Sequence, residues 1–214
     1  QYAIIAPTDS AFLAPDRSPG VAGVDYPEGI RVGSFFRRLA LAWRFRDADL
    51  LFAAEVDEES RFVFRRQVAA RIGAVAPFLR VMTAPYAVAH EGRIVWIADA
   101  YTTSSSFPLS RHRRFGRNVV NYLRNSVKVV VDATSGSIQL YIIDETDPIA
   151  EGLARSFPGL MLPLDEMPEG LRAHLRYPRE LLDLQSEVLY EYHQETAPGF
   201  HGQRDVWTTP EQFT

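Results

Sequence analysis

Residues 121–147 read NYLRNSVKVVVDATSGSIQLYIIDETD and carry the clearest fold signal in the chain. Two alternating apolar runs, 127–131 and 138–143, flank a short turn of small polar residues. Val127, Val129 and Val131 share one side of the first run because side chains alternate between the two faces of a strand. Gly136 is free to adopt the positive φ of a tight turn. The stretch therefore predicts an antiparallel β-hairpin.

A second hairpin is predicted upstream, at about residues 86–100. Its turn is His90-Glu91-Gly92, and the returning strand places Ile94 and Trp96 on one face. The polar run 102–106 follows, and we interpret it as a solvated loop that ends the strand. A short helix is expected over residues 118–124. Two hairpins supply about four strands, which is near the usual size of a sheet.

Helical signals flank the strands. Asp147 directly before Pro148 is a capping residue followed by a proline in the first turn, which predicts a helix to about residue 157. Pro168 and Pro178 begin two further helices, which we expect to reach residues 175 and 194. Hairpins followed by helices indicate an α+β domain. We expect an antiparallel sheet, built from hairpins at 86–100 and 127–143, with flanking helices and a helical C-terminal third.

A helix is also predicted after Ser34. Spacings of three and four place Phe35 or Phe36, Leu39 and Trp43 on one face. A stripe of aromatic side chains at helical spacing is typical of a protein core, and we interpret it in that way.

The domain organisation follows from composition. Proline and glycine punctuate residues 1–30 too densely for a helix, so we expect an extended arm there and a single domain over 31–214. The absence of cysteine excludes disulfides and thiolate metal sites. The longest apolar runs are far shorter than the ~20 residues of a membrane-spanning helix. A start at Gln1 instead of Met indicates a processed product or an excised piece.

Charge is unevenly distributed along the chain. The net charge of −4 argues against a general nucleic-acid binder. Two stretches hold basic residues without any acid, and residues 165–195 are acidic. These segments either pair within the fold or form an interaction surface. The candidates for such a surface are the basic residues Arg111, Arg113, Arg114 and Arg117, and the polar residues Thr102, Thr103 and Ser104.

No catalytic, cofactor-binding or metal-binding residue is predicted. The histidines lack the spacing of metal ligands, and no Gly-rich phosphate loop follows a strand. Asp144, Glu145 and Asp147 lack the glycine and closing glutamate of a calcium loop, although a single peripheral cation there stays an alternative. Asp99 and Asp132, on adjacent strands, could act as a glycosidase pair if the fold placed them correctly.

Four long stretches resemble one protein family. They are GSFFRRLALAWRFRDADLL (33–51), WIADAYTTS (96–104), NYLRNSVKVVVDATSG (121–136) and FPGLMLPLDEMPEGLRAHLRYPRELLDLQSEVLYEYH (157–193). They are similar to the bacterial uncharacterised protein family 0182, over most of the chain from residue 25 onward. The resemblance implies a longer membrane protein, in which several spanning helices precede a large region outside the cytoplasm. This chain would be part of that region, held at the cell membrane by the rest of its parent, and no functional residue can be transferred from the family.

Three functions are therefore expected from the sequence. The first is a non-enzymatic extracytoplasmic domain that binds a protein or a cell-envelope component. The second is a cell-envelope hydrolase or transferase whose Asp and Glu residues assemble only in the fold. The third is structural support for the membrane portion. A cleft with converging acids of raised pKa would favour the second, and an apolar patch or basic groove would favour the first.

Overall fold

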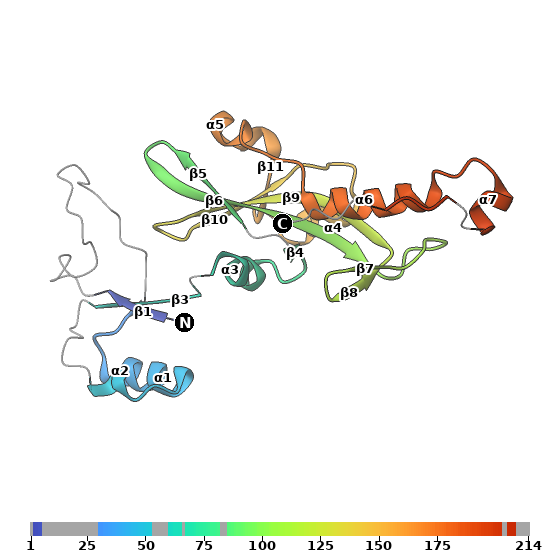
Figure 1. Ribbon diagram of the computed structural model, residues 1–214. Coiled ribbons are helices and arrows are strands. Elements are labelled where there is room, and N and C mark those ends of the chain that lie inside the picture. Colours follow the sequence, from blue (N-terminus) through green and yellow to red (C-terminus); the bar gives the residue numbers. More distant parts are fainter. Residues whose placement is uncertain are drawn as a thin grey trace.

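The structure is a computed structural model that describes residues 2–5, 30–52, 60–65, 67–81, 85–202 and 205–208 (Figure 1). Its elements are β1 (Tyr2–Ile5), β2 (Ile30–Arg31), α1 (Phe35–Phe45), α2 (Asp49–Phe52), β3 (Arg61–Phe64), α3 (Val68–Val75), β4 (Arg80–Val81), β5 (Tyr86–His90), β6 (Arg93–Ser104), β7 (Arg113–Phe115), β8 (Asn118–Val120), β9 (Tyr122–Asp132), β10 (Ile138–Ile142), α4 (Pro148–Ser156), β11 (Met161–Pro163), the 3₁₀ helix η1 (Leu164–Glu166), α5 (Glu169–Arg172), α6 (Arg179–Tyr192) and α7 (Ala197–Gly202). None of the helices in these ranges is both long enough and apolar enough to span a bilayer.

The larger sheet has the strand order β11-β10-β9-β6-β4, with β5 also paired to β6. Both predicted hairpins are present, as β5–β6 and β9–β10, and β6 joins them by pairing antiparallel with β9. Gly92 and Gly136 occupy the two turns with φ of 73° and 71°, a conformation that glycine adopts without strain. The prediction of an α+β fold with antiparallel hairpins is confirmed.

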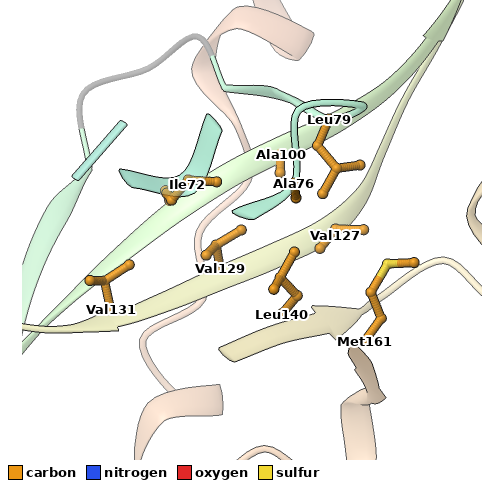
Figure 2. Packing of buried hydrophobic residues seen from close by; sticks show 10 residues of the cluster. Ile72, Ala76, Leu79, Ala100, Val127, Val129, Val131, Leu140 and Met161 are labelled. Carbon is orange, nitrogen blue, oxygen red and sulfur yellow. The ribbon is translucent and has the colours of Figure 1, made fainter. Parts of the chain in front are cut away.

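Both faces of this sheet are covered, which explains why residues 126–131 of β9 are buried without alternation. Figure 2 shows one face, where Ile72 of α3 and Ala76, the residue directly after this helix, pack against Val127 and Val129 of β9. On the opposite face the buried residues are Val88, Val95, Ile97, Val130, Tyr141, Met167 and Leu171, which bring α5 and η1 against the sheet. In β9 the sequence indicated an apolar face only for Val127, Val129 and Val131, and the structure also buries Val130 on the opposite face.

A second, three-stranded sheet has the order β1-β3-β2. Helices α1 and α2 lie over it, on the side away from the larger sheet (Figure 1). Val32, Ala42, Leu50 and Phe62 form the small core between these layers. Of the arm predicted at 1–30, only its ends are described; residues 6–29 lie outside the described ranges, and the division into arm and domain stays a prediction.

The aromatic stripe of α1 is not core, so that interpretation was wrong. Phe36 is 78 % exposed and Trp43 is 86 % exposed, whereas Ala42 on the neighbouring face of the helix is buried. Leu41 and Phe45 pack with Ala42 against the small sheet. Periodicity correctly grouped the stripe on one face, but the small sheet covers the neighbouring face.

Two expectations for residues 102–124 were also wrong. Strand β6 continues to Ser104 because, beyond a bulge after Ala100, its residues pair with the start of β9. The segment 118–124, expected to be a short helix, instead forms β8 and the start of β9, and β8 pairs with β7 in a separate hairpin. In both segments the strands form because they pair with strands distant in sequence. Short polar strands show little local pattern from which such pairing could be predicted.

The helices of the C-terminal third begin at or directly after the prolines from which their starts were predicted. Asp147 is the N-cap of α4, and its side chain accepts a hydrogen bond from the Ile149 N–H. Pro178 precedes α6, which ends two residues earlier than expected. Helix α5 is a single turn that ends at Arg172, so the expected extension to residue 175 is wrong.

Candidate functional site

Two adjoining open cavities follow α6, and we call them together the α6 groove. The first, of about 610 Å³, lies between α6, β9 and the segment 175–178. The second, of about 500 Å³, lies between α6 and residues 109–123. Leu123, Leu181 and Gln185 line both cavities, so the two lie next to each other.

One side of α6 supplies the wall of the groove. Its lining residues are spaced by three and four positions, which places them on one helical face: Leu181, Leu184, Gln185, Val188 and Tyr192. Leu181 and Leu184 also pack on the buried cluster of Tyr101, Phe115 and Val120, which fixes the helix against the β7–β8 hairpin. The wall is apolar, with Gln185 as its polar exception.

The guanidinium groups at the groove have partners inside the fold. Arg111 and Arg113 both form ion pairs with Glu191 of α6. The hydrogen bond from Arg113, together with that from Arg111, holds the pKa of Glu191 below its usual value. Arg124 donates to a carboxylate oxygen of Asp144 at 3.0 Å. Much of the basic charge at the groove is therefore neutralised locally.

The only lysine, Lys128, lies at the bottom of the first cavity and is buried with Asp99 on the neighbouring strand. The two residues face each other across the β6–β9 pair and form an ion pair. Lys128 Nζ also donates to the Arg176 carbonyl at 2.9 Å. The Arg176 guanidinium lies 4.6 Å from the centre of the Tyr86 ring. The buried ion pair thus ties the sheet to the segment that leads into α6.

A second buried carboxylate, Asp147, lies close to the bulge in β6. It accepts hydrogen bonds from Thr102 Oγ1 and Ser126 Oγ, each at 2.5 Å, and from the Tyr122 hydroxyl at 2.6 Å. Burial acts to raise the pKa of Asp147, but these hydrogen bonds and the one from the Ile149 N–H outweigh it, so the pKa is lowered. Burial and the hydrogen bond to Asp147 raise the pKa of Tyr122 to about 12.

The residues predicted as an interaction surface differ in their burial and in whether they line the α6 groove. Arg111 and Arg113 line the groove, and Arg114 and Arg117 are exposed beside the β7–β8 turn without lining it. Thr102 is buried with its hydroxyl on Asp147, so including it in a surface was wrong. Thr103 and Ser104 are half-buried in β6 opposite Leu123 and Tyr122. The α6 wall was not among the predicted site residues, although the unusual width of its apolar face was a usable signal.

The acids considered for chemistry are also separated. Asp99 pairs with Lys128, and Asp132 lies four residues further along β9, about 13 Å away at the usual rise per residue. Glycosidase carboxyl groups lie about 5–9.5 Å apart. Asp132 accepts hydrogen bonds from the N–H groups of Thr134 and Ser135, as a turn-forming residue does. The pair is therefore placed for structural roles.

The acidic residues after β10 do not converge either. Asp144 accepts hydrogen bonds from Arg124 and from Thr146, whereas the buried Asp147 accepts hydrogen bonds from Thr102 and Ser126. Among the residues that the structure describes, no group of three His, Asp or Glu side chains is arranged to hold a metal ion.

Comparison with known proteins identifies relatives along the full chain. The family model described as "Uncharacterised protein family (UPF0182)" matches residues 1–214, further toward the N-terminus than the stretches noted in the sequence. The chain is 39 % identical over 214 residues to a UPF0182 protein of Pelotomaculum thermopropionicum, and the match covers 100 % of this chain and 23 % of the relative. It is 44 % identical over 170 residues to a UPF0182 protein of Alkaliphilus metalliredigens, covering 79 % of this chain and 18 % of that protein.

A UPF0182 protein of Moorella thermoacetica is 41 % identical over 185 residues, which are 86 % of this chain and 20 % of the relative. The chain thus spans about a fifth of the length of the curated relatives it matches. No solved structure matches it. The match along the whole chain shows that it belongs to the uncharacterised protein family UPF0182.

Proposed function

We propose that this chain is a non-enzymatic binding domain, held outside the cytoplasm by a longer membrane protein, and that the α6 groove receives a polypeptide segment of a partner. The observation that carries the proposal is the groove itself, two adjoining cavities with a mostly apolar wall. Membership of a family of longer proteins supports the idea of a parent chain. The extracytoplasmic location rests on the resemblance described above.

The chemistry of the lining favours a polypeptide over a small anion. Arg111, Arg113 and Arg124 have carboxylate partners, so an anion would have to compete with Glu191 and Asp144 for them. Apolar side chains with a few polar groups suit the side chains and backbone of an extended segment. Val188 and Tyr192 are 37 % and 50 % exposed, so their apolar surface is available.

The carboxylates near the groove support binding over acid–base catalysis. A general acid working near neutral pH needs a raised pKa. The pKa of Asp147 and that of Glu191 are instead lowered, the first by buried hydrogen bonds that outweigh desolvation and the second by arginine partners.

Site-specific photo-crosslinking tests the binding role in the native parent protein. A photoreactive amino acid at Val188 is expected to form an adduct with a separate protein in cells, and the charged variant Leu184→Arg should abolish that adduct. The matched control places the same amino acid at Ile94, which is 55 % exposed at the start of β6. An adduct only within the parent chain would identify structural support instead, and equal adducts at both positions would contradict the groove as the site.

The location is tested separately because the chain has no cysteine. Substitution Val119→Cys, at an exposed position of β8, places a single thiol in this part of the protein. A membrane-impermeant maleimide should modify it in intact cells as fully as after lysis. Modification only after lysis would overturn the extracytoplasmic assignment.

A further inference from the structure

Helix α1 carries a cluster of exposed apolar side chains that the α6 groove does not use. Phe35 and Leu39 are 65 % and 43 % exposed, and Phe36 and Trp43 are more exposed still. In Figure 1 the helix lies at the outer edge of the molecule, on the far side of the small sheet from the larger one. We call these four residues the α1 aromatic face. Several large apolar side chains together on a surface indicate a contact site more strongly than scattered ones.

The helix has more apolar surface than its own sheet can cover. At about 100° per residue, the four side chains fall within an arc of about 100°. The neighbouring arc holds Leu41, Ala42 and Phe45, which pack on the small sheet. The remaining arc holds Ala40 and the two arginines Arg37 and Arg44. The helix therefore presents one apolar side to its sheet and a second apolar side to the outside.

Positive charge borders this outer side. Residues 30–46 contain five arginines and no acid, and the first acids that follow are Asp47 and Asp49. Within the described part of the chain, Arg37, Arg44 and Arg46 form no ion pair. Arg37 Nη1 donates to the Arg31 carbonyl at 3.4 Å, and the Arg44 guanidinium lies 6.0 Å from the centre of the Phe45 ring. The guanidinium charge is therefore available to an external anionic surface.

We propose that the α1 aromatic face docks on the surface of an anionic lipid bilayer, with Phe36 and Trp43 inserted at the headgroup level and Arg37 and Arg44 on lipid phosphates. A helix with Trp, Phe and Leu on one side and arginine beside them has the composition of helices that lie in a membrane interface. Tryptophan is also enriched at that depth. The helix would lie on the bilayer and would not cross it.

Charge also distinguishes the bilayer from a second copy of the chain as the occupant. A twofold contact through this face would bring the arginines of both copies into one interface, because such interfaces pair the same patch on both subunits. Like charges brought together in this way oppose association. The anionic bilayer offers both apolar depth and complementary charge. The proposal does not depend on the α6 groove and assigns a second contact on a different part of the molecule.

Vesicle co-sedimentation of the 214-residue chain tests the proposal. Vesicles of phosphatidylglycerol and phosphatidylcholine should bind it at least tenfold more tightly than phosphatidylcholine alone. The variant Phe36→Ser/Trp43→Ser should lower the partition coefficient at least tenfold. The variant Arg37→Gln/Arg44→Gln should lower it about 25-fold on anionic vesicles only, since each of the two basic residues near such a surface contributes roughly fivefold.

The matched control is Leu182→Ser/Leu189→Ser, which removes two apolar residues of α6 that are 53 % and 56 % exposed. It should bind vesicles like the wild type. Circular dichroism of every variant should be unchanged. The proposal is overturned if the folded wild type does not bind anionic vesicles, or if control and α1 variants lose binding equally. Equal binding to soluble poly-glutamate would indicate an acidic protein surface, and a wild-type dimer abolished by Trp43→Ser would indicate a second copy; either result also overturns it.

Discussion

The two arginine-rich stretches of this chain resemble each other in sequence and differ in the fold. Around β9, Arg111 and Arg113 pair with Glu191, and Lys128 is buried against Asp99. In α1, Arg37 and Arg44 lie exposed next to Phe36 and Trp43. The acids that neutralise the first stretch come from strand β6, the loop after β10 and helix α6. None of these acids pairs with an arginine of α1.

The structural role of a run of basic residues therefore depends on the partners that the fold supplies. The β9 stretch is part of the scaffold, since its charges connect the sheet to α6 and the loop before it. The α1 stretch leaves its charge and its aromatic side chains to the outside. Variants in the two regions test this contrast through their free energies of unfolding.

The largest effect is expected from the buried ion pair. Asp99→Ala leaves the Lys128 ammonium buried without its partner, and breaking such a pair costs about 3–5 kcal/mol. Urea unfolding measures the loss. The double variant Asp99→Leu/Lys128→Met removes both charges and should recover most of it. A single variant as stable as the wild type would show that these charges are not part of the scaffold.

The next effect concerns Asp147. Asp147→Ala removes the cap of α4 and leaves the hydroxyls of Thr102 and Ser126 without their acceptor, at a cost of about 3 kcal/mol. Glu145→Ala, an exposed acid in the same loop, should change the free energy of unfolding by under about 0.5 kcal/mol.

The pH dependence of Asp147 follows from its lowered pKa. A carboxyl whose pKa is lower in the folded state stabilises the protein above its unfolded pKa of about 3.9, and that contribution is lost as the pH falls through the folded pKa. The stability difference between wild type and Asp147→Ala should therefore shrink below about pH 4. A difference that grows on acidification would contradict the hydrogen-bonded carboxylate.

A smaller effect is expected at the rim of the groove. Glu191→Gln weakens the ion pairs to Arg111 and Arg113, and it should lower the urea midpoint less than either variant above because Arg111 is largely exposed. The loss should disappear in 1 M NaCl, where the screening length is about 3 Å. A loss independent of salt would mean that Glu191 acts through packing.

The smallest effect is expected on α1 itself. Phe36→Ser/Trp43→Ser should leave the urea midpoint within error, since both side chains are exposed and surface changes are usually within about ±0.5 kcal/mol. Phe62→Ala, which empties the small core beneath the same helix, should instead destabilise that region strongly. Marked destabilisation by the exposed pair would show that the aromatic face is used in folding.

The features that sequence predicted correctly are local ones. The β9–β10 hairpin follows from alternation with Gly136 in the turn, and α4 follows from Asp147 before Pro148. Each signal lies within a few residues, so no distant contact is needed to interpret it. The α+β class followed from the order of these elements.

The features that were missed depend on contacts distant in sequence. Thr102 is buried because β6 extends along β9 to reach Asp147, a residue 45 positions away. Glu191 of α6 forms its ion pair with Arg113, which lines the α6 groove and lies 78 positions away in sequence. For α1, periodicity tells which residues share a face but does not tell which face the fold covers.

Hydrogen exchange measured by mass spectrometry, with and without phosphatidylglycerol vesicles, tests the contrast most directly. Without vesicles, β6 and β9 should exchange most slowly because they lie in the middle of the large sheet, and α1 should exchange faster. With vesicles, added protection should be confined to residues 35–45. Added protection over residues 111–128 instead, or none along the chain, would contradict the separation into a basic stretch that serves the fold and one that serves an external contact.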